Sequence, residues 1–340
     1  MTQPPREESR FMVNLMISGV ILIVLLALAG YLMSRMPGHT FAGPLPELSA
    51  TENQLKERLF SHVETLAGKI GERNLWQYDN LQQAAVYIEK EFKQAGLLTR
   101  MVPHESAGKQ VLNIEAEIPG GDDAAGVLVV GAHYDSLIGT RGANDNGSGV
   151  AALIELARFF GAGKLNRTLR FVAFVNEEPP FFKTARMGSW VYAQQAAAGG
   201  DQFAGMISLE TLGYYTAEPL TQRFPLPLMR WFYPHRGDFL ALVGNYKSSG
   251  LLKRSVKTFR QHAGFPSQGI VAPGWLPGVD WSDHWSFWKV GSPAIMATDT
   301  ALYRYPYYHG VDDTVEKLNY DALARVVTGL QAVIAEFAND

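Results

Sequence analysis

One stretch constrains the fold of this chain more than any other: VLVVGAHYDSLIGTRGANDNGSG, at positions 127–149. It opens with four consecutive apolar residues between glycines, a run typical of a strand buried on both faces of a sheet. His133 and Asp135 follow directly, and Asp145 lies in a Gly-rich loop before the next helical pattern. A histidine standing alone would most simply be a packed core or surface residue. An imidazole together with carboxylates beyond a buried strand instead indicates a site with a chemical role.

The composition limits the chemistry that such a site can use. The 340-residue chain is 47% hydrophobic, which is enough for one large or two ordinary domains with a core. A formal net charge of -3 gives no electrostatic basis for binding nucleic acid. The sequence has no cysteine, so disulfides, thiolate zinc sites and thiol nucleophiles are excluded. Any metal must therefore be held by nitrogen and oxygen ligands.

The N-terminal region contains an apolar segment without any charge, residues 11–34. As a helix rising about 1.5 Å per residue, it would cross a hydrocarbon core of roughly 30 Å. Its length favours a retained transmembrane anchor, whereas Ala27-Leu28-Ala29 would suit cleavage as a signal sequence. Two arginines before the segment and one after it predict a cytoplasmic tail at 1–10 and an extracytoplasmic remainder, periplasmic or extracellular. Residues 35–50 contain Pro and Gly without periodicity and are expected to be a linker.

The rest of the chain alternates strand patterns with helix patterns. Strands are predicted at 111–118, 127–130, 169–175, 205–209, 239–243 and 294–297. Helices are predicted at 52–69, 79–95, after Asp145, and at 188–197, 251–262 and 320–337. This order predicts an α/β fold in which helices flank a mainly parallel central sheet, preceded by the one N-terminal apolar helix.

Acidic side chains follow the predicted strands at the edge where ligands bind in such folds. Glu177 and Glu178 come directly after one strand, and Glu210 comes after the next. Successive side chains point in different directions, so one glutamate can bind metal while its neighbour faces substrate as a general base. A solvated pair in a turn is the simpler interpretation of these glutamates alone. Together with the first stretch and a late His309, they supply ligands for two divalent ions about 3.5 to 4 Å apart.

The motifs that carry these residues resemble family M28, the zinc-dependent exopeptidases that include the co-catalytic di-zinc aminopeptidases. They are GAHYDS at 131–136, GANDNGSG at 142–149, FVNEE at 174–178, SDHWSF at 282–287 and YHGVDDTVEKLN at 308–319. Their combined order is specific, although each motif alone is weak, and the resemblance covers roughly residue 55 to the C-terminus. It implies an M28-like peptidase domain over residues 51–340, two Zn²⁺ ions per chain and peptide substrates.

The resemblance also implies a set of metal ligands. His133 and Glu210 would bind the first zinc, Glu178 and His309 the second, and Asp145 would bridge the two ions. A carboxylate in a Gly-rich loop suits the bridge, because the backbone must approach the metals closely. The family usually carries an aspartate at the position of Glu210, whose side chain is longer by one methylene. The sequence therefore leaves open whether the first metal site is filled.

Three further roles are implied by the same motifs. Glu177 would be the general base that takes a proton from the water between the metals. Asp135 would orient the imidazole of His133, and Tyr308 would hydrogen-bond the developing oxyanion. The pair Asp283-His284 is expected to support ligands or to face substrate rather than to bind metal. The aromatic stretch 230–233 is interpreted either as ordinary loop packing or as a lid over the site.

The expected function is therefore a membrane-anchored zinc aminopeptidase that hydrolyses N-terminal residues from peptides. A glutaminyl-cyclase-like acyltransferase with one working zinc is the alternative enzyme, and the departure at Glu210 keeps it open. The Asp-Asn-Gly-Ser-Gly run at 145–149 favours the peptidase. A third possibility is a catalytically inactive M28-like ectodomain that acts as a receptor or scaffold, against which the intact ligand set argues. The preferred side chain and the oligomeric state are not determined by the sequence.

Overall fold

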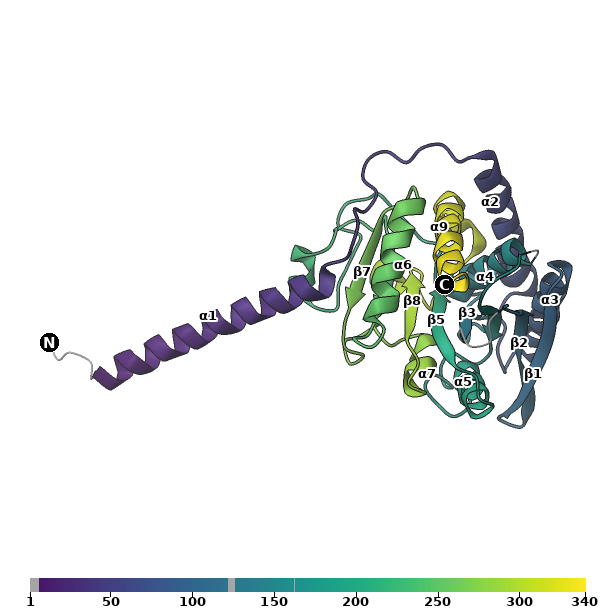
Figure 1. Ribbon diagram of the computed structural model, residues 1–340, viewed down its shortest axis with the longest axis horizontal. Helices are drawn as coiled ribbons and strands as arrows, with labels where there is room; N and C mark the ends of the chain where they lie inside the picture. The colour runs from purple at the N-terminus through teal and green to yellow at the C-terminus, as the bar shows by residue number, and fades with distance from the viewer. Residues whose placement is uncertain (1–5, 122–125, 162) are drawn as a thin grey trace.

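The computed structural model describes residues 6–121, 126–161 and 163–340, and in these residues one eight-stranded sheet forms the centre (Figure 1). The strand order is β1-β2-β4-β3-β5-β8-β6-β7. The strands are β1 (Leu98–Ser106), β2 (Lys109–Ile118), β3 (Val127–His133), β4 (Thr168–Phe174), β5 (Phe203–Glu210), β6 (Leu240–Gly244), β7 (Ser267–Val271) and β8 (Ala294–Thr298). Parallel pairing joins β4-β3-β5-β8 and β6-β7, and antiparallel pairing joins β1-β2, β2-β4 and β8-β6. The predicted α/β fold with a mainly parallel central sheet is confirmed.

Helices cover both faces of this sheet. One face packs against α2 (Ala50–Val63), α3 (Tyr78–Gln94), α4 (Gly149–Phe160), α6 (Ser249–His262) and α9 (Tyr320–Ala338). The other face packs against α5 (Gly188–Ala198) and α7 (His284–Lys289). Short segments complete the chain: η1 (Glu64–Ile70), η3 (Ala143–Ser148), η4 (Pro227–Trp231), α8 (Ala301–Arg304) and η5 (Val315–Lys317).

Strand β3 illustrates why the predicted pattern folds in this way. Leu128 and Val130 belong to the core cluster on one face, and Val127 and Val129 belong to the cluster on the other. Because successive side chains alternate between faces, a strand covered on both sides must be apolar throughout. Burial of each such side chain stabilises the fold by about 1.5 to 3 kcal/mol. The carboxyl end of β3 is thereby held in the middle of the sheet.

The predicted helices and strands are present, with boundaries that differ by a few residues. The helix expected at 52–69 begins at Ala50, and Ser49 and Glu52 form a reciprocal capping box at its start. Two strands were not predicted, β1 and β7, which lie at the two edges of the sheet. Strand β1 carries Pro103 and exposed polar residues, a composition tolerated at an edge because one row of backbone groups needs no partner there.

The predicted apolar segment forms the helix α1 (Arg6–Ser34), which begins five residues earlier than expected and projects away from the domain (Figure 1). Within the described part of the chain, α1 is the helix long and apolar enough to cross a membrane, over Arg10–Ser34. This feature indicates the secretory route and fits either an anchor or a signal sequence. The first five residues of the predicted tail lie outside the described residues.

Apart from Ala50, the first residue of α2, the predicted linker has no helix or strand, and it contacts the domain. The guanidinium of Arg260 on α6 donates hydrogen bonds to the carbonyls of Met36, Pro37 and Gly38. The backbone N–H of Ser267 donates to the hydroxyl of Thr40 at 2.8 Å. The chain that leaves α1 is therefore tied to the edge of the sheet formed by β7.

Candidate metal centre

The parallel strands bring polar side chains to one edge of the sheet. His133 is the last residue of β3, and Glu210 is the last residue of its neighbour β5. Glu177 and Glu178 follow the end of β4, the neighbour of β3 on its other side. Since parallel strands end at the same edge, these side chains converge beyond it. The sequence prediction that three polar clusters share one edge agrees with this arrangement.

Two groups of ligand atoms meet at Asp145. Its Oδ1 lies 3.2 Å from Nε2 of His133, which is also 3.5 Å from Oε2 of Glu210. Its Oδ2 lies 3.1 Å from Nε2 of His309, which is also 3.5 Å from Oε2 of Glu178. Within each group of three, the ligand atoms lie within 4.8 Å of one another. The two groups share one carboxylate, as a pair of neighbouring metal ions requires.

Several buried atoms in this cluster lack the partners that buried polar atoms normally have. Among the described residues, Nε2 of His133, Oδ1 of Asp145 and Oε1 of Glu178 form no hydrogen bond of suitable geometry, although the first two atoms lie 3.2 Å apart. Buried polar atoms without a partner are rare in folded proteins, and a bound ion can satisfy them. The atoms are imidazole nitrogen and carboxylate oxygen, a ligand set that suits Zn²⁺. The residues present therefore fit a divalent metal site.

The charges of the cluster lead to the same conclusion. Burial, together with the carboxylates of Asp145 and Glu177, raises the pKa of Glu178 well above its ordinary value. Burial is also the main cause that raises the pKa of Glu177, and the carboxylate of Glu210 adds to it. Burial opposes protonation of His133, but the carboxylates of Glu210 and Glu177 outweigh it and raise the pKa of the imidazole. So many carboxylates in one buried place repel one another, and divalent cations would offset that repulsion.

Asp135 lies beside the imidazole of His133, as expected, and also supports the two glutamates. Its carboxylate accepts hydrogen bonds from the backbone N–H groups of Glu177 at 3.1 Å and Glu178 at 3.2 Å. The Nδ1 of His133 lies 3.2 Å from the backbone carbonyl oxygen of Asp135 and 3.6 Å from its carboxylate. Asp135 thus fixes the backbone that carries both glutamates, and its main chain contacts the imidazole.

Tyr308 and His309 lie together at the open side of the cluster. Their rings stack with centroids 3.9 Å apart, and the His309 side chain is 32% exposed. His309 has a φ of +58°, an uncommon conformation for a residue with a side chain. Burial and nearby carboxylates, first Asp145 and then Glu210, raise the pKa of Tyr308 well above its ordinary value. Its hydroxyl therefore stays protonated and able to donate at neutral pH.

Comparison with known proteins agrees with this geometry. The family model described as "Peptidase family M28" matches residues 113–334, a range that holds both groups of ligand atoms. The chain belongs to peptidase family M28. The M28 resemblance of the sequence motifs is thereby confirmed.

Individual relatives and solved structures extend this result. "Uncharacterized protein YfbL" of Escherichia coli (strain K12) is 37% identical over 282 residues, which cover 81% of this chain and 86% of that protein. BSAP, a zinc aminopeptidase from Bacillus subtilis, is similar with a TM-score of 0.66 at 15% identity, covering 88% of this chain and 97% of that structure. Tannerella forsythia glutaminyl cyclase is similar with a TM-score of 0.60 at 18% identity, covering 82% of this chain and 98% of that structure. At such identities the solved structures show the shared fold and do not separate the two activities.

The loop that carries Asp145 is held by residues that sequence reasoning did not single out. The carboxylate of Asp313 accepts the backbone N–H groups of Asn144 at 2.8 Å and Asp145 at 3.1 Å. The buried guanidinium of Arg73 donates to backbone carbonyls on both sides of the site, including those of Tyr134 and Gly142. Asp313 lies inside one of the M28 motifs, which was the available signal. Arg73 lies in no motif, so only the folded chain identifies it.

The pair Asp283-His284 is buried and stands outside both groups of ligand atoms. Burial raises the pKa of Asp283 to about 7, although the positive charge of His133 opposes this. The Nε2 of His284 lies 2.9 Å from the backbone carbonyl oxygen of Val279, and its ring packs edge-on against Trp288. That this pair supports ligands or faces substrate rather than binding metal stays a prediction.

Ser282, from the same M28 motif, hydrogen-bonds directly to a candidate ligand. Its hydroxyl donates to Oε2 of Glu210 at 2.7 Å. We expect Ser282→Ala to weaken metal binding by about 10- to 100-fold, because Glu210 loses the partner that orients it. Zinc affinity measured by competition with a chelator tests this, with Ser286→Ala as control, since that buried serine bonds to Ser189 instead. Unchanged affinity in Ser282→Ala would show that Glu210 needs no such support.

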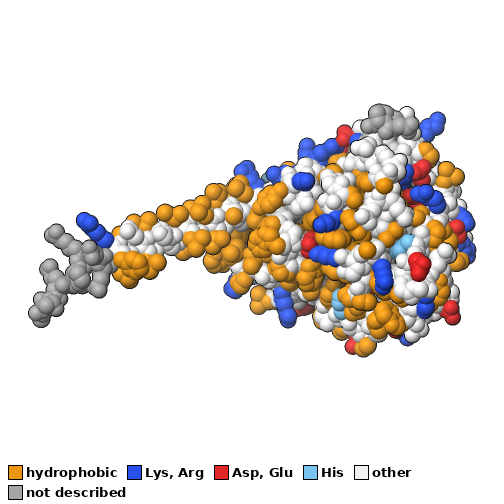
Figure 2. All heavy atoms as spheres, turned by 90° about the horizontal axis from the view of Figure 1, so that it is seen from below, with side chains coloured by type: hydrophobic (Ala, Val, Ile, Leu, Met, Phe, Trp, Pro, Cys, Tyr) orange, Lys and Arg blue, Asp and Glu red, His pale blue; other side chains and the backbone are white. Residues whose placement is uncertain are grey.

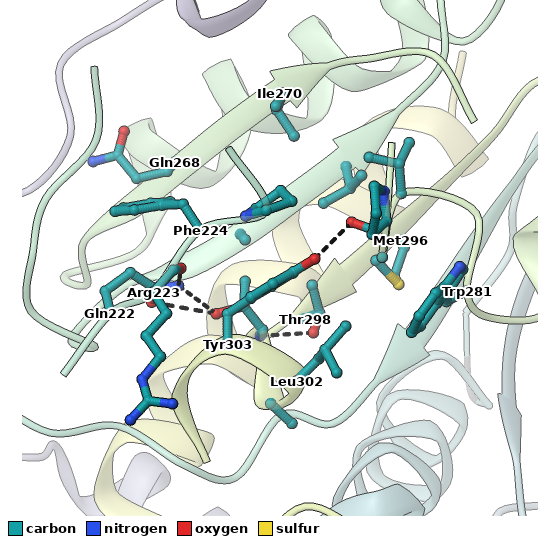
Figure 3. A pocket seen from close by; sticks show the side chains of 18 of the residues that line it. Gln222, Arg223, Phe224, Gln268, Ile270, Trp281, Met296, Thr298, Leu302 and Tyr303 are labelled. Carbon is teal, nitrogen blue, oxygen red and sulfur yellow. Dashed lines mark hydrogen bonds between the residues drawn. The ribbon is translucent and has the colours of Figure 1, made fainter. Parts of the chain in front are cut away.

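An apolar cavity of about 110 Å³ opens beside the metal centre (Figure 3). Part of its wall is formed by the candidate ligand Glu210, its neighbour Thr211 and Tyr308. Figure 3 shows side chains from distant parts of the chain in its wall: most are apolar, such as Phe224, Ile270, Trp281, Met296 and Leu302, and some are polar, such as Gln222, Arg223 and Gln268. A ligand that reaches the metal centre can therefore place an apolar group in this cavity.

Proposed function

We propose that this protein is a zinc aminopeptidase that removes apolar N-terminal residues from peptides, anchored by α1 with its catalytic domain outside the cytoplasm. The observation that carries the proposal is the carboxylate of Asp145, shared by two groups of metal ligands, with an apolar cavity adjoining. The proposed ligands are His133, Asp145, Glu178, Glu210 and His309.

Glu177 is the proposed general base. It belongs to neither group of ligand atoms, and its Oε2 lies 4.0 Å from Nε2 of His133. Two bound zinc ions would supply Lewis-acid activation of water and polarisation of the scissile carbonyl. Glu177 takes the proton from the attacking water and later returns it to the departing amine, so its charge is restored at the end of the cycle. The hydrogen bond from its backbone to Asp135 keeps the side chain in place for both transfers.

Tyr308 and the cavity complete the proposed site. The protonated hydroxyl of Tyr308 would donate a hydrogen bond to the oxyanion as negative charge develops on the carbonyl oxygen. The cavity, whose wall includes Met296 and Ile270, would receive the side chain of the N-terminal residue. Most of the wall is apolar, so an apolar side chain gains more burial there than a charged one, which would lose water against a largely apolar surface.

A substrate profile with and without chelator tests the proposed activity. For the purified full-length protein, we expect leucyl, methionyl and phenylalanyl amides to exceed aspartyl and lysyl amides in kcat/KM by at least about tenfold. A chelator should abolish hydrolysis, and added zinc should restore it. Hydrolysis that persists in chelator, or a preference for charged residues, would contradict the metal mechanism or the role of the cavity, respectively.

The glutaminyl-cyclase-like acyltransferase is the second candidate, since the fold is shared and Glu210 departs from the usual aspartate. Zinc counted by atomic absorption separates the two, because two ions per chain favour the peptidase and one favours the cyclase. Peptides with N-terminal glutamine give a second test, since cyclisation releases ammonia and leaves the peptide bonds intact. A protein purified without chelator that holds no metal would instead favour an inactive M28-like ectodomain.

A further inference from the structure

The segment from Leu220 to Tyr233, which we name the aromatic segment, lies beside the C-terminal end of α1 (Figure 1). The ring of Phe232 packs on the helix at Gly30, so closely that a Cβ there would lie 2.6 Å from the ring. Met33 of α1 and Met229 of the aromatic segment pack against the same apolar cluster on the sheet. Where α1 leaves the domain, the aromatic segment is therefore its direct neighbour.

The two sides of the aromatic segment have different surroundings. On the inner side, Phe224, Met229 and Tyr233 line the apolar cavity beside the metal centre. On the outer side, Trp231 is 78% exposed, Leu220 is 77% exposed and Leu226, which does not line the cavity, is 38% exposed. Several large apolar side chains exposed on one short segment indicate an interaction surface. The sequence interpretations of a lid and of loop packing account for the inner side alone.

Hydrophobic side chains continue from α1 onto the domain at the base of the helix, with Lys and Arg side chains beside them (Figure 2). The aromatic segment holds two arginines and no acidic residue. Arg223 and Arg230 are exposed and form no ion pair with any described residue. Arg35, which directly follows α1, is exposed as well. This combination of apolar and cationic side chains is complementary to the surface of an anionic phospholipid bilayer.

The position of Gly30 on α1 determines how deep in a bilayer the contact between α1 and the aromatic segment would lie. It lies four residues before the end of α1 at Ser34, which at about 1.5 Å per residue is roughly 6 Å along the helix axis. If Arg10–Ser34 spans the bilayer, Gly30 lies eight residues, about 12 Å, from Leu22 at the middle of the span, close to the boundary of a hydrocarbon core roughly 30 Å thick. Tryptophan is enriched at that level in membrane proteins, because its ring is apolar and its N–H is polar.

We propose that the outer side of the aromatic segment is a membrane-contact surface that places Trp231 and Leu226 in the interface of a phospholipid bilayer. Because the inner side of the same segment lines the apolar cavity, the contact holds that wall of the cavity at the bilayer surface. The proposal rests on α1 being retained as an anchor and goes beyond the proposed peptidase activity.

The absence of cysteine from the sequence allows a direct test. The full-length Trp231→Cys variant is labelled at its single cysteine with an environment-sensitive fluorophore. It is then reconstituted in vesicles of phosphatidylcholine and phosphatidylglycerol. Leu98→Cys is the matched control, since Leu98 is 69% exposed and lies on β1, at the opposite edge of the sheet from β7. We expect the label at 231 to be shielded from aqueous iodide and quenched by brominated acyl chains, and the label at 98 to show the reverse.

Each other outcome overturns the proposal. Equal iodide quenching at both positions would place the outer side of the aromatic segment in water. Shielding without quenching by brominated lipid would mean that a second copy of the chain covers it. A label in Leu22→Cys reports on α1 itself, so a water-exposed label at 22 would refute the anchor and the contact together. If Trp231→Cys fails to fold, Leu226→Cys takes its place. None of these measurements depends on hydrolysis, so the proposed peptidase activity is tested separately.

Discussion

Replacement of Glu177 by glutamine is expected to lower kcat by about 100- to 10,000-fold, because the site loses the group that takes and returns the proton. The metal content should stay unchanged, since Glu177 belongs to neither group of ligand atoms. Initial rates on the preferred aminoacyl amide and zinc content by atomic absorption measure the two effects. The amide side chain of glutamine keeps the size of the glutamate, and the hydrogen bond from the backbone of residue 177 to Asp135 is preserved.

Glu105→Gln is the matched control for this variant, since Glu105 is exposed on the outermost strand β1 and belongs to neither group of ligand atoms. It should keep full activity. Near-normal turnover in Glu177→Gln would remove the assignment of the base. Loss of zinc from the same variant would instead identify Glu177 as a ligand and would require a different residue as base.

Asp145→Asn is expected to remove both metal ions and with them all hydrolysis. One oxygen of Asp145 faces His133 at 3.2 Å and the other faces His309 at 3.1 Å, so this carboxylate belongs to both sites. Loss of its charge should weaken zinc binding by more than the about 100-fold that loss of an outer partner of a metal ligand costs. His309→Ala should lose the second ion and retain the first, which distinguishes a shared ligand from two independent ones.

The control for the variants Asp145→Asn and His309→Ala is Asp312→Asn. Asp312 is an exposed neighbour in the same motif as His309. It should bind metal as the unmodified protein does. If Asp145→Asn retained one zinc per chain, the assignment of Asp145 as a ligand shared by two ions would be wrong. The single-zinc acyltransferase would then become the better interpretation. Metal content after dialysis against buffer without chelator gives the measurement.

Local patterns predicted much of this molecule. The apolar run at the start of β3 could be recognised in the sequence, because a strand covered on both faces must be apolar at every position. The amphipathic helices could be recognised because an apolar stripe on each helix faces the sheet. The edge strand β1 was missed because its exposed polar residues and Pro103 resemble a loop, and its conformation depends on pairing with β2. Strand β7 is short and contains Gly269, and it is defined by its pairing with β6.

The sequence by itself determined which residues could serve a metal centre and in what order the elements follow. Parallel strands end at one edge, so polar residues after successive strands must converge there, and this consequence requires no coordinates. Only the tertiary structure decided which atoms approach Asp145, that Ser282 holds Glu210, and that Arg73 ties the loop backbone together. It also decided that the aromatic segment lies between α1 and the cavity. These contacts join residues far apart in the chain, and their geometry depends on the packing of all the elements between them, which no local pattern encodes.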